Sequence, residues 1–128
     1  MILDTSFLID LEREQLRRSP GKATSFLREN AQRALAINFT IAGELASGLP
    51  PERQDYWKAV IGRFRFIDYS SDVGWSYGRI HQALRRQGKP IGANDLWIAA
   101  TAVAHRLPVV TKNSEEFRRV EGLEVIDY

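Results

Sequence analysis

The sequence predicts a single α/β domain, residues 1–128, with a central, mostly parallel sheet and helices on both faces. Short apolar runs of strand length alternate along the chain with longer segments of helical periodicity. Strands that alternate with helices are joined by crossovers, which favour parallel pairing. A length of 128 residues is enough for one hydrophobic core, and no linker, repeat or low-complexity segment divides the chain.

The N-terminal segment predicts a buried strand followed directly by a helix. Residues 1–3 are apolar and end at Asp4, after which Thr5 and Ser6 offer hydroxyl groups for a helix N-cap. The helix continues into a charged stretch and ends at the Ser-Pro-Gly break of residues 19–21.

The next segments predict a helix over residues 22–33 and a second strand over residues 34–39. Thr40 is the expected cap of a short helix that contains Glu44. The Gly-Leu-Pro-Pro run of residues 48–51 ends that helix.

The middle of the chain predicts a helix over residues 52–63 and a short strand at residues 66–67. Residues 70–72 (Ser-Ser-Asp) are good N-cap residues for a long helix. That helix ends at the Gln-Gly-Lys-Pro run of residues 87–90.

The last third contains an almost wholly apolar helix from residue 91 to about residue 105, whose first turn carries Asp95. A helix without a polar stripe is normally buried, and an isolated carboxylate is costly in a core. Strands at residues 108–110 and 123–126, with a helical turn at 113–119 between them, complete the chain.

Composition indicates a soluble, intracellular protein, which we expect to be cytoplasmic and not membrane-bound. The apolar fraction is 44%, the charged fraction 27% and the net charge +2, which permits a polyanionic partner without requiring one. The chain has no cysteine, so disulfides, thiolate zinc sites and cysteine nucleophiles are excluded. No apolar run is long enough to span a bilayer.

Polar side chains recur at the carboxyl ends of the predicted strands, where open parallel sheets form their sites. Asp4 ends the first strand, and Glu44 lies one helical turn after the second. Asp95 opens the helix that leads into the fourth strand, and Asn113 and Glu116 follow that strand. Acids without nitrogen or sulfur ligands suit a hard cation such as Mg²⁺ or Mn²⁺. Such an ion can turn bound water into a nucleophile that attacks a phosphodiester.

Four segments together resemble the motifs of PIN-domain ribonucleases, and more narrowly the VapC toxins of toxin–antitoxin pairs. They are residues 1–6 (MILDTS), 40–45 (TIAGEL), 90–100 (PIGANDLWIAA) and 110–117 (VTKNSEEF). The resemblance covers the whole chain in order. It implies a Mg²⁺- or Mn²⁺-dependent endoribonuclease in which Asp4, Glu44 and Asp95 bind the metal and cleavage leaves 3′-hydroxyl and 5′-phosphate ends.

The fourth motif departs from the family pattern, because a position that often carries Asp is Asn113 in this chain. Asn113 brings no charge but can accept through its carbonyl oxygen or orient a water. Glu116, three residues on, is a candidate substitute ligand. The same pair matches a capping box, in which the glutamate reaches back to the helix cap.

Further candidates concern water and substrate. The hydroxyls of Thr5, Ser6 and Thr111 are expected either to hold metal-bound waters or to cap helices. Arginine pairs are the candidate phosphate contacts, and solvated helix ends are the alternative for each. These pairs are Arg17-Arg18, Arg85-Arg86 and Arg118-Arg119.

The resemblance also implies partners: an RNA substrate, a small cognate antitoxin that covers the active site, and a second copy of the chain in a homodimer. Residues 56–66 offer aromatic and arginine side chains for either protein contact. Three alternatives stay open: a PIN fold that binds RNA or a partner without cutting, a signalling receiver domain, and a flap-type DNA nuclease. Lys112 suits a receiver domain, but Asp4 has no adjacent acid, and the chain has no room for the DNA-guiding insertions of a flap nuclease.

Overall fold

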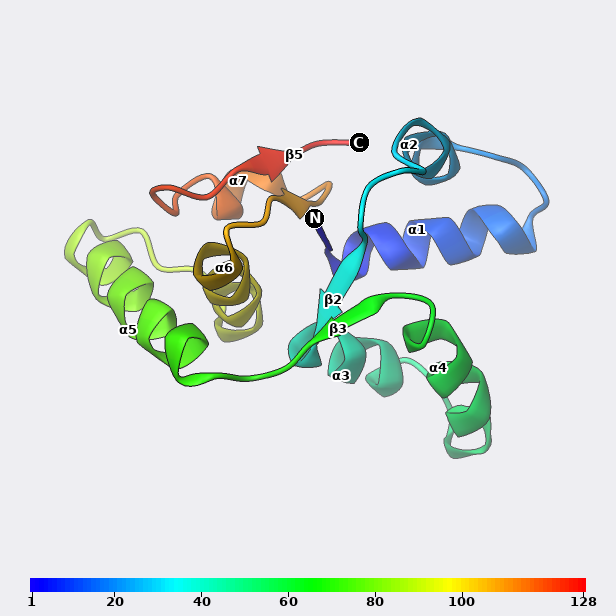
Figure 1. Cartoon of the computed structure of the whole chain (residues 1–128), viewed down its shortest axis with the longest axis horizontal. Coiled ribbons are helices and arrows are strands. Elements are labelled where there is room, and N and C mark those ends of the chain that lie inside the picture. Colours follow the sequence, from blue (N-terminus) through cyan, green and yellow to red (C-terminus); the bar gives the residue numbers. More distant parts are fainter.

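The computed structural model describes all 128 residues and contains a five-stranded sheet of order β3-β2-β1-β4-β5 (Figure 1). Every neighbouring pair of strands is parallel, which confirms the predicted α/β class. The strands are β1 (Ile2–Leu3), β2 (Ala36–Asn38), β3 (Arg65–Ile67), β4 (Val109–Val110) and β5 (Val125–Ile126).

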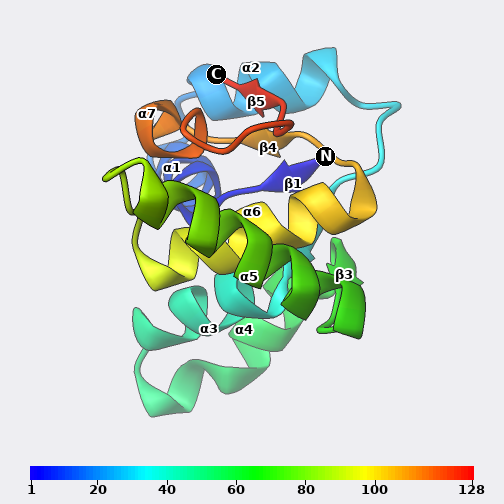
Figure 2. The same cartoon turned by 90° about the vertical axis from the view of Figure 1, so that its left-hand side faces the viewer.

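Seven α-helices surround this sheet, as the alternating pattern predicts. Helices α1 and α2 lie on one side, and α5 and α6 lie side by side on the other (Figures 1 and 2). A single 3₁₀ turn, η1 (Pro51–Arg53), precedes α4. The helices are α1 (Thr5–Leu16), α2 (Lys22–Glu29), α3 (Phe39–Ser47), α4 (Gln54–Ile61), α5 (Ser71–Arg86), α6 (Ala93–His105) and α7 (Ser114–Phe117).

The core lies between the sheet and its helices, and α6 is its most buried helix. Leu96, Ile98 and the alanines at positions 99, 100 and 102 are inaccessible or almost so. Small alanine side chains let the helix approach its neighbours closely, and α6 packs extensively against α5. The prediction of a buried apolar helix is therefore confirmed, with Asp95 in its first turn. No helix of the chain combines the length and the apolar character needed to cross a membrane.

Two predicted helix starts were one or two residues late. The side chain of Asp4, not Thr5 or Ser6, caps α1, because its carboxylate accepts from the Thr5 backbone N–H. The cap of α3 is Asn38, not Thr40, since the Asn38 side-chain oxygen accepts from Ile41 N at 3.0 Å. Asn and Asp are as good as Ser and Thr at this position, so the local signal was ambiguous.

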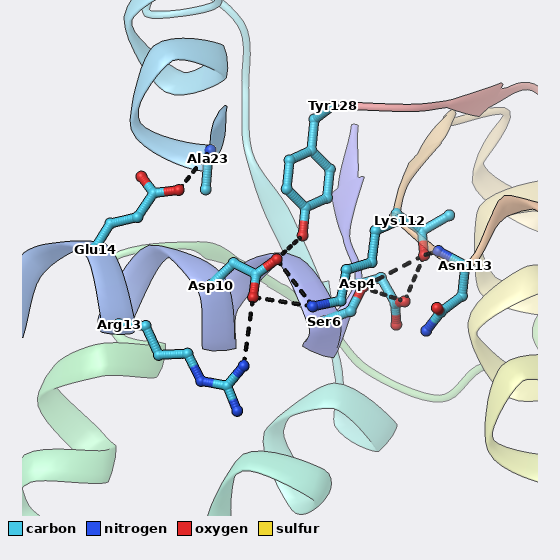
Figure 3. Close-up of polar contacts among 10 residues, drawn as sticks. Asp4, Ser6, Asp10, Arg13, Glu14, Ala23, Lys112, Asn113 and Tyr128 are labelled. Atoms are coloured by element: carbon cyan, nitrogen blue, oxygen red, sulfur yellow. Dashed lines mark hydrogen bonds and ion pairs between the residues drawn. The ribbon is translucent and has the colours of Figure 1, made fainter. Parts of the chain in front are cut away.

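Helix α2 is shorter than predicted and ends at Glu29. The side-chain amide of Asn30 donates to the Phe26 carbonyl oxygen at 2.8 Å and so satisfies one of the carbonyl groups in the last turn of the helix. At its other end, α2 is capped from α1. The cap residue Gly21 has no side chain to cap with, and Glu14 accepts from the backbone N–H groups of Gly21, Ala23 and Thr24. Figure 3 shows the bond to Ala23.

The strand register places Asp4 beside Thr111. Leu3 pairs with Val110 across β1 and β4, so the next residue of each strand lies at the same edge of the sheet. The Asp4 backbone N–H donates to the Val110 carbonyl oxygen at 3.0 Å and holds this register beyond the strand ends. Residues more than a hundred positions apart therefore meet where the candidate site was predicted.

Candidate active site

Asp4 is almost fully buried, at 4% exposure, and hydrogen bonds from three residues hold its carboxylate. Oδ1 accepts from the Thr5 backbone N–H at 2.8 Å. Oδ2 accepts from the hydroxyls of Thr111 at 2.8 Å and Ser6 at 3.1 Å. The hydroxyls of Ser6 and Thr111 therefore bind a carboxylate directly and fix its orientation. That these groups also hold metal-bound waters stays a prediction.

Glu44 reaches the same edge of the sheet from α3. Its Oε1 accepts from the Thr5 side-chain hydroxyl at 3.0 Å, and Thr5 is the first residue of α1 after Asp4. Glu44 is partly buried, although it lies on a helix with an otherwise apolar buried face formed by Ile41 and Ala42. Thr5 thus links the two acids, because its backbone N–H donates to Asp4 and its hydroxyl donates to Glu44.

Asp95 is the acid most affected by its surroundings. Burial, the hydrogen bond it shares with Glu116, and the negative charges of Asp4, Glu116 and Glu44 together raise its pKa to about 7. Each of these effects disfavours the charged carboxylate. Acids from the β1–α1 junction, α3, α6 and α7 are therefore close enough to act on one another electrostatically.

Glu116 faces Asp95 and not the start of its own helix. The predicted capping box is wrong, because the Asn113 side chain makes no capping hydrogen bond to α7. In such a box Glu116 would accept from the Asn113 backbone N–H. That N–H donates instead to the Thr111 hydroxyl at 3.0 Å. Asn113 itself is exposed at the edge of the site, with its side chain free of intramolecular hydrogen bonds.

The predicted arginine contacts do not all lie near these acids. Arg17 is the C-cap of α1, and the helix of 12 residues separates it from Thr5 by about 18 Å. Arg85 and Arg86 end α5, from which residues 87–92 lead directly to the start of α6 and Asp95. The structure thus places the pair Arg85-Arg86 on the side of the molecule that carries the site, and the pair Arg17-Arg18 away from it.

The donor set is all oxygen, which suits Mg²⁺ or Mn²⁺. The acidic side chains do not form a preorganised group of three around one point. One reason is that both oxygens of Asp4 already accept hydrogen bonds. Mg²⁺ commonly uses only one or two protein carboxylates and keeps several waters, so such a set fits it. Positive charge here would also relieve the repulsion that raises the pKa of Asp95.

Two features of this region escaped the sequence reasoning. Asn38 is fully buried; it caps α3 and donates from its side chain to the Thr101 hydroxyl at 3.0 Å, so it ties β2 to α6. Its place between a strand and a helix was the available signal. Near Asp4, Asp10 accepts from Lys112 Nζ at 2.9 and 3.0 Å and from the Tyr128 hydroxyl at 2.9 Å (Figure 3). No sequence signal connects these three residues.

The sequence profile of the family described as PIN domain matches residues 1–123. Ribonuclease VapC2 from Haemophilus influenzae is 31% identical, over 95% of this chain and 92% of that protein. The tRNA(fMet)-specific endonuclease VapC from Shigella flexneri is 34% identical, over 69% of this chain and 67% of that protein. The crystal structure of DNA-bound VapBC from Salmonella typhimurium superposes with a TM-score of 0.84 at 30% identity, over 98% of this chain and 96% of that one.

Proposed function

The chain belongs to the PIN-domain family, and within it to the VapC ribonuclease toxins, and from this premise we propose that it hydrolyses RNA at the acids around Asp95. One observation carries the assignment of the site. The pKa of Asp95 is raised to about 7 by burial and by the carboxyls of Glu116, Asp4 and Glu44, so acids from four separate elements lie close enough to act on one another. We propose the cytoplasm as the place of action, because that is where an RNA substrate is found.

In this proposal, Mg²⁺ or Mn²⁺ is held by Asp95, Glu116 and Glu44, with Asp4 as a further ligand. The ion supplies a nucleophilic water at neutral pH and stabilises negative charge on the phosphate that is attacked. The chain's own residues supply position. Thr111 and Ser6 keep the Asp4 carboxylate in one orientation, and Thr5 does the same for Glu44. Ligands oriented in this way lose activity when their hydrogen-bond partners are removed.

Asn113 has a different role from the acids. Its exposed carboxamide can accept or donate one hydrogen bond to a water or to an RNA phosphate, without adding charge to a site that already has four carboxylates. Its backbone N–H anchors it to Thr111, the same residue that holds Asp4. We therefore assign Asn113 to substrate or water positioning.

Substitution of Asp95 tests the proposal. Asp95→Asn keeps the size of the side chain and should abolish Mg²⁺-dependent RNA cleavage while the circular dichroism spectrum and unfolding midpoint stay native. Asp72→Asn is the matched control, because Asp72 also lies in the first turn of a helix but is exposed on α5. Full cleavage by Asp95→Asn would rule out Asp95 as part of the site. Absence of cleavage by the unaltered protein would instead leave the alternative of a PIN fold that acts by binding.

Transfer RNA is the first substrate class to test, since the Shigella flexneri relative is a tRNA(fMet)-specific endonuclease. We propose that cleavage leaves a 3′-hydroxyl and a 5′-phosphate. Sequencing the ends of RNAs cut after brief induction identifies both the RNA and the chemistry. Ends that carry a 2′,3′-cyclic phosphate would contradict hydrolysis by an attacking water.

The antitoxin is the expected protein partner, because similar chains occur in structures of VapBC complexes. A hollow of about 330 Å³ lies between α1, α3 and α4, and Glu44 is one of its lining residues. Its apolar walls include Leu11, Leu45, Trp57 and Phe64. We propose that an antitoxin helix fills this hollow, with a basic side chain directed past Glu44 to the acids. Leu45→Asp should weaken antitoxin binding and leave RNA cleavage intact.

The predicted homodimer stays a proposal as well. Within residues 56–66, Trp57 donates to the Ala42 carbonyl oxygen at 2.8 Å and Tyr56 donates to Glu12 at 2.6 Å. Both side chains line the hollow between α1, α3 and α4. Phe66, on the edge strand β3, is 46% exposed and is the residue of this segment most available to a second copy. A monomeric mass in light scattering over a wide concentration range would contradict the dimer.

A further inference from the structure

Five basic residues gather on one side of the acidic site. Arg85 and Arg86 end α5, Lys89 lies in the turn that leads to α6, and Arg118 and Arg119 directly follow α7. Because residues 87–92 reverse the chain between α5 and α6, the end of α5 lies close to the start of α6 (Figure 2). Asp95 belongs to the first turn of α6, and Glu116 belongs to α7. The basic residues therefore flank both of these acids.

Part of this group lines a hollow of about 640 Å³ without hydrophobic side chains. Lys89 and Pro90 form one wall, and Glu115, Arg118 and Arg119 form the other. The Arg119 guanidinium donates to the Pro90 carbonyl oxygen at 3.0 Å and ties the two walls together. The hollow is therefore built from the two segments that carry Asp95 and Glu116.

The positive charge in this region is only partly neutralised. Arg118 pairs with Asp127, and Arg119 lies 3.9 Å from the almost fully exposed Glu115. Arg85, Arg86 and Lys89 are exposed and form no ion pair.

The opposite rim of the site is different. Lys112 and Arg13 both lie beside the same carboxylate, Asp10, at 2.9 and 3.8 Å. One of these two positive charges is therefore neutralised there, whereas Arg85, Arg86 and Lys89 on the α5 side have no carboxylate partner. A polyanion that approaches four carboxylates is repelled by them and needs cationic contacts next to the site.

We propose that this hollow, with Lys89 in its wall and Arg85 and Arg86 at the adjoining end of α5, binds the phosphate backbone of the RNA strand on one side of the bond that is cut. The inference rests on the proposed function and deepens it by giving the path of the substrate. Lysine and arginine side chains contact phosphates whatever the base. The hollow therefore increases the affinity for RNA and positions the strand, but it does not select a base sequence.

A binding experiment without cleavage tests this. The probe is a short fluorescein-labelled single-stranded RNA in EDTA, and the readout is fluorescence anisotropy at several salt concentrations. The variant is Arg85→Gln/Arg86→Gln/Lys89→Gln. The matched control, Arg17→Gln/Lys22→Gln/Arg28→Gln, removes the same charge from exposed positions on α1 and α2.

We expect the hollow variant to bind about tenfold or more weakly and its salt slope to fall by about 2, at roughly 0.7 per lost phosphate contact. At saturating RNA its kcat should be native while KM rises. The control should stay within about twofold in affinity. Equal losses in both variants would indicate a general charge effect and overturn the proposal, as would native binding by the hollow variant.

Two further measurements keep the test decisive. Lys89→Gln alone, in an exposed turn, should show part of the same loss if the triple variant folds poorly. The proposed function fails separately, when the unaltered protein does not cleave RNA, and the assignment of the site to Asp95 fails when Asp95→Asn still cleaves it. RNA binding by the hollow is measured in EDTA, without cleavage, so its result does not depend on the chemistry assigned to the acids.

Discussion

Replacement of Thr111 by valine is the sharpest test of how the site is held. The Thr111 hydroxyl is fully buried, donates to Asp4 Oδ2 at 2.8 Å and accepts from the Asn113 backbone N–H at 3.0 Å. Valine has nearly the same shape but no polar group. It leaves the buried Asp4 carboxylate with one donor fewer, and leaves the part-buried Asn113 backbone N–H without its acceptor.

The size of the effect follows from these contacts. A hydrogen bond to a charged group contributes about 1.5–3 kcal/mol, and a buried N–H left without a partner costs about 1–3 kcal/mol. The extra apolar surface of valine offsets about 1 kcal/mol of this loss. We therefore expect the free energy of unfolding to fall by about 2–4 kcal/mol. Cleavage should fall by about 10- to 100-fold, because Asp4 is then held by Ser6 and the Thr5 N–H alone.

Urea unfolding and RNA cleavage at saturating Mg²⁺ measure the two effects. Thr111→Ser is the control: it keeps both hydrogen bonds and loses one buried methyl group, at a cost of about 1 kcal/mol. If Thr111→Val is as stable and as active as Thr111→Ser, the hydroxyl does not position Asp4, and our account of the site is refuted.

Three other substitutions test the fold that supports the site. Glu14 accepts from three backbone N–H groups and the Thr24 hydroxyl; burial alone would raise its pKa, but these hydrogen bonds lower it from 4.5 to about 2. Glu14 therefore stabilises the fold above pH 4.5, and this stabilisation is lost as the pH falls towards 2. Glu14→Gln should remove this dependence of the free energy of unfolding on pH, and should lower that free energy by about 1–2 kcal/mol after solvent screening. Asn38→Ala removes the α3 cap and the bond to Thr101, and should lower the free energy of unfolding by about 2–3 kcal/mol; a loss below about 0.5 kcal/mol would contradict a structural role. Arg106 ends α6 with a left-handed φ of 54°, so Arg106→Gly should raise the free energy of unfolding by about 0.5 kcal/mol and the urea midpoint with it; a lower midpoint would show that the arginine side chain stabilises the helix end.

Local patterns were enough to predict the elements and their order, and the resemblance of the four motifs to known ribonucleases was enough to predict the family. The alternation of short apolar runs with helical periodicity led to a parallel sheet, because each strand must cross over a helix to reach the next. Helix ends were less exact at Asp4, Asn38 and Asn30: more than one nearby polar residue could cap α1 or α3, and the Asn30 side chain ends α2 early. The competition between them depends on tertiary contacts that a local pattern does not contain.

The role of Glu116 in the site also depended on a tertiary contact that the local pattern does not contain. Its spacing from Asn113 matched a capping box, and the spacing was correct. The outcome depended on the Thr111 hydroxyl, which accepts from the Asn113 N–H and leaves Glu116 free to face Asp95. A hydroxyl outside the four residues of the motif therefore decided between the two readings.

The amino-acid sequence by itself determined the α/β fold, the parallel order of elements and the acids at the strand ends, since these follow from periodicity and from residue type. Tertiary structure alone decided which polar groups meet: Thr111 with Asp4, Glu44 with Thr5, Glu116 with Asp95, and Lys112 with Asp10. The physical reason is that such contacts depend on strand register and helix packing to within an ångström. Those distances are set by the whole core and not by any one segment.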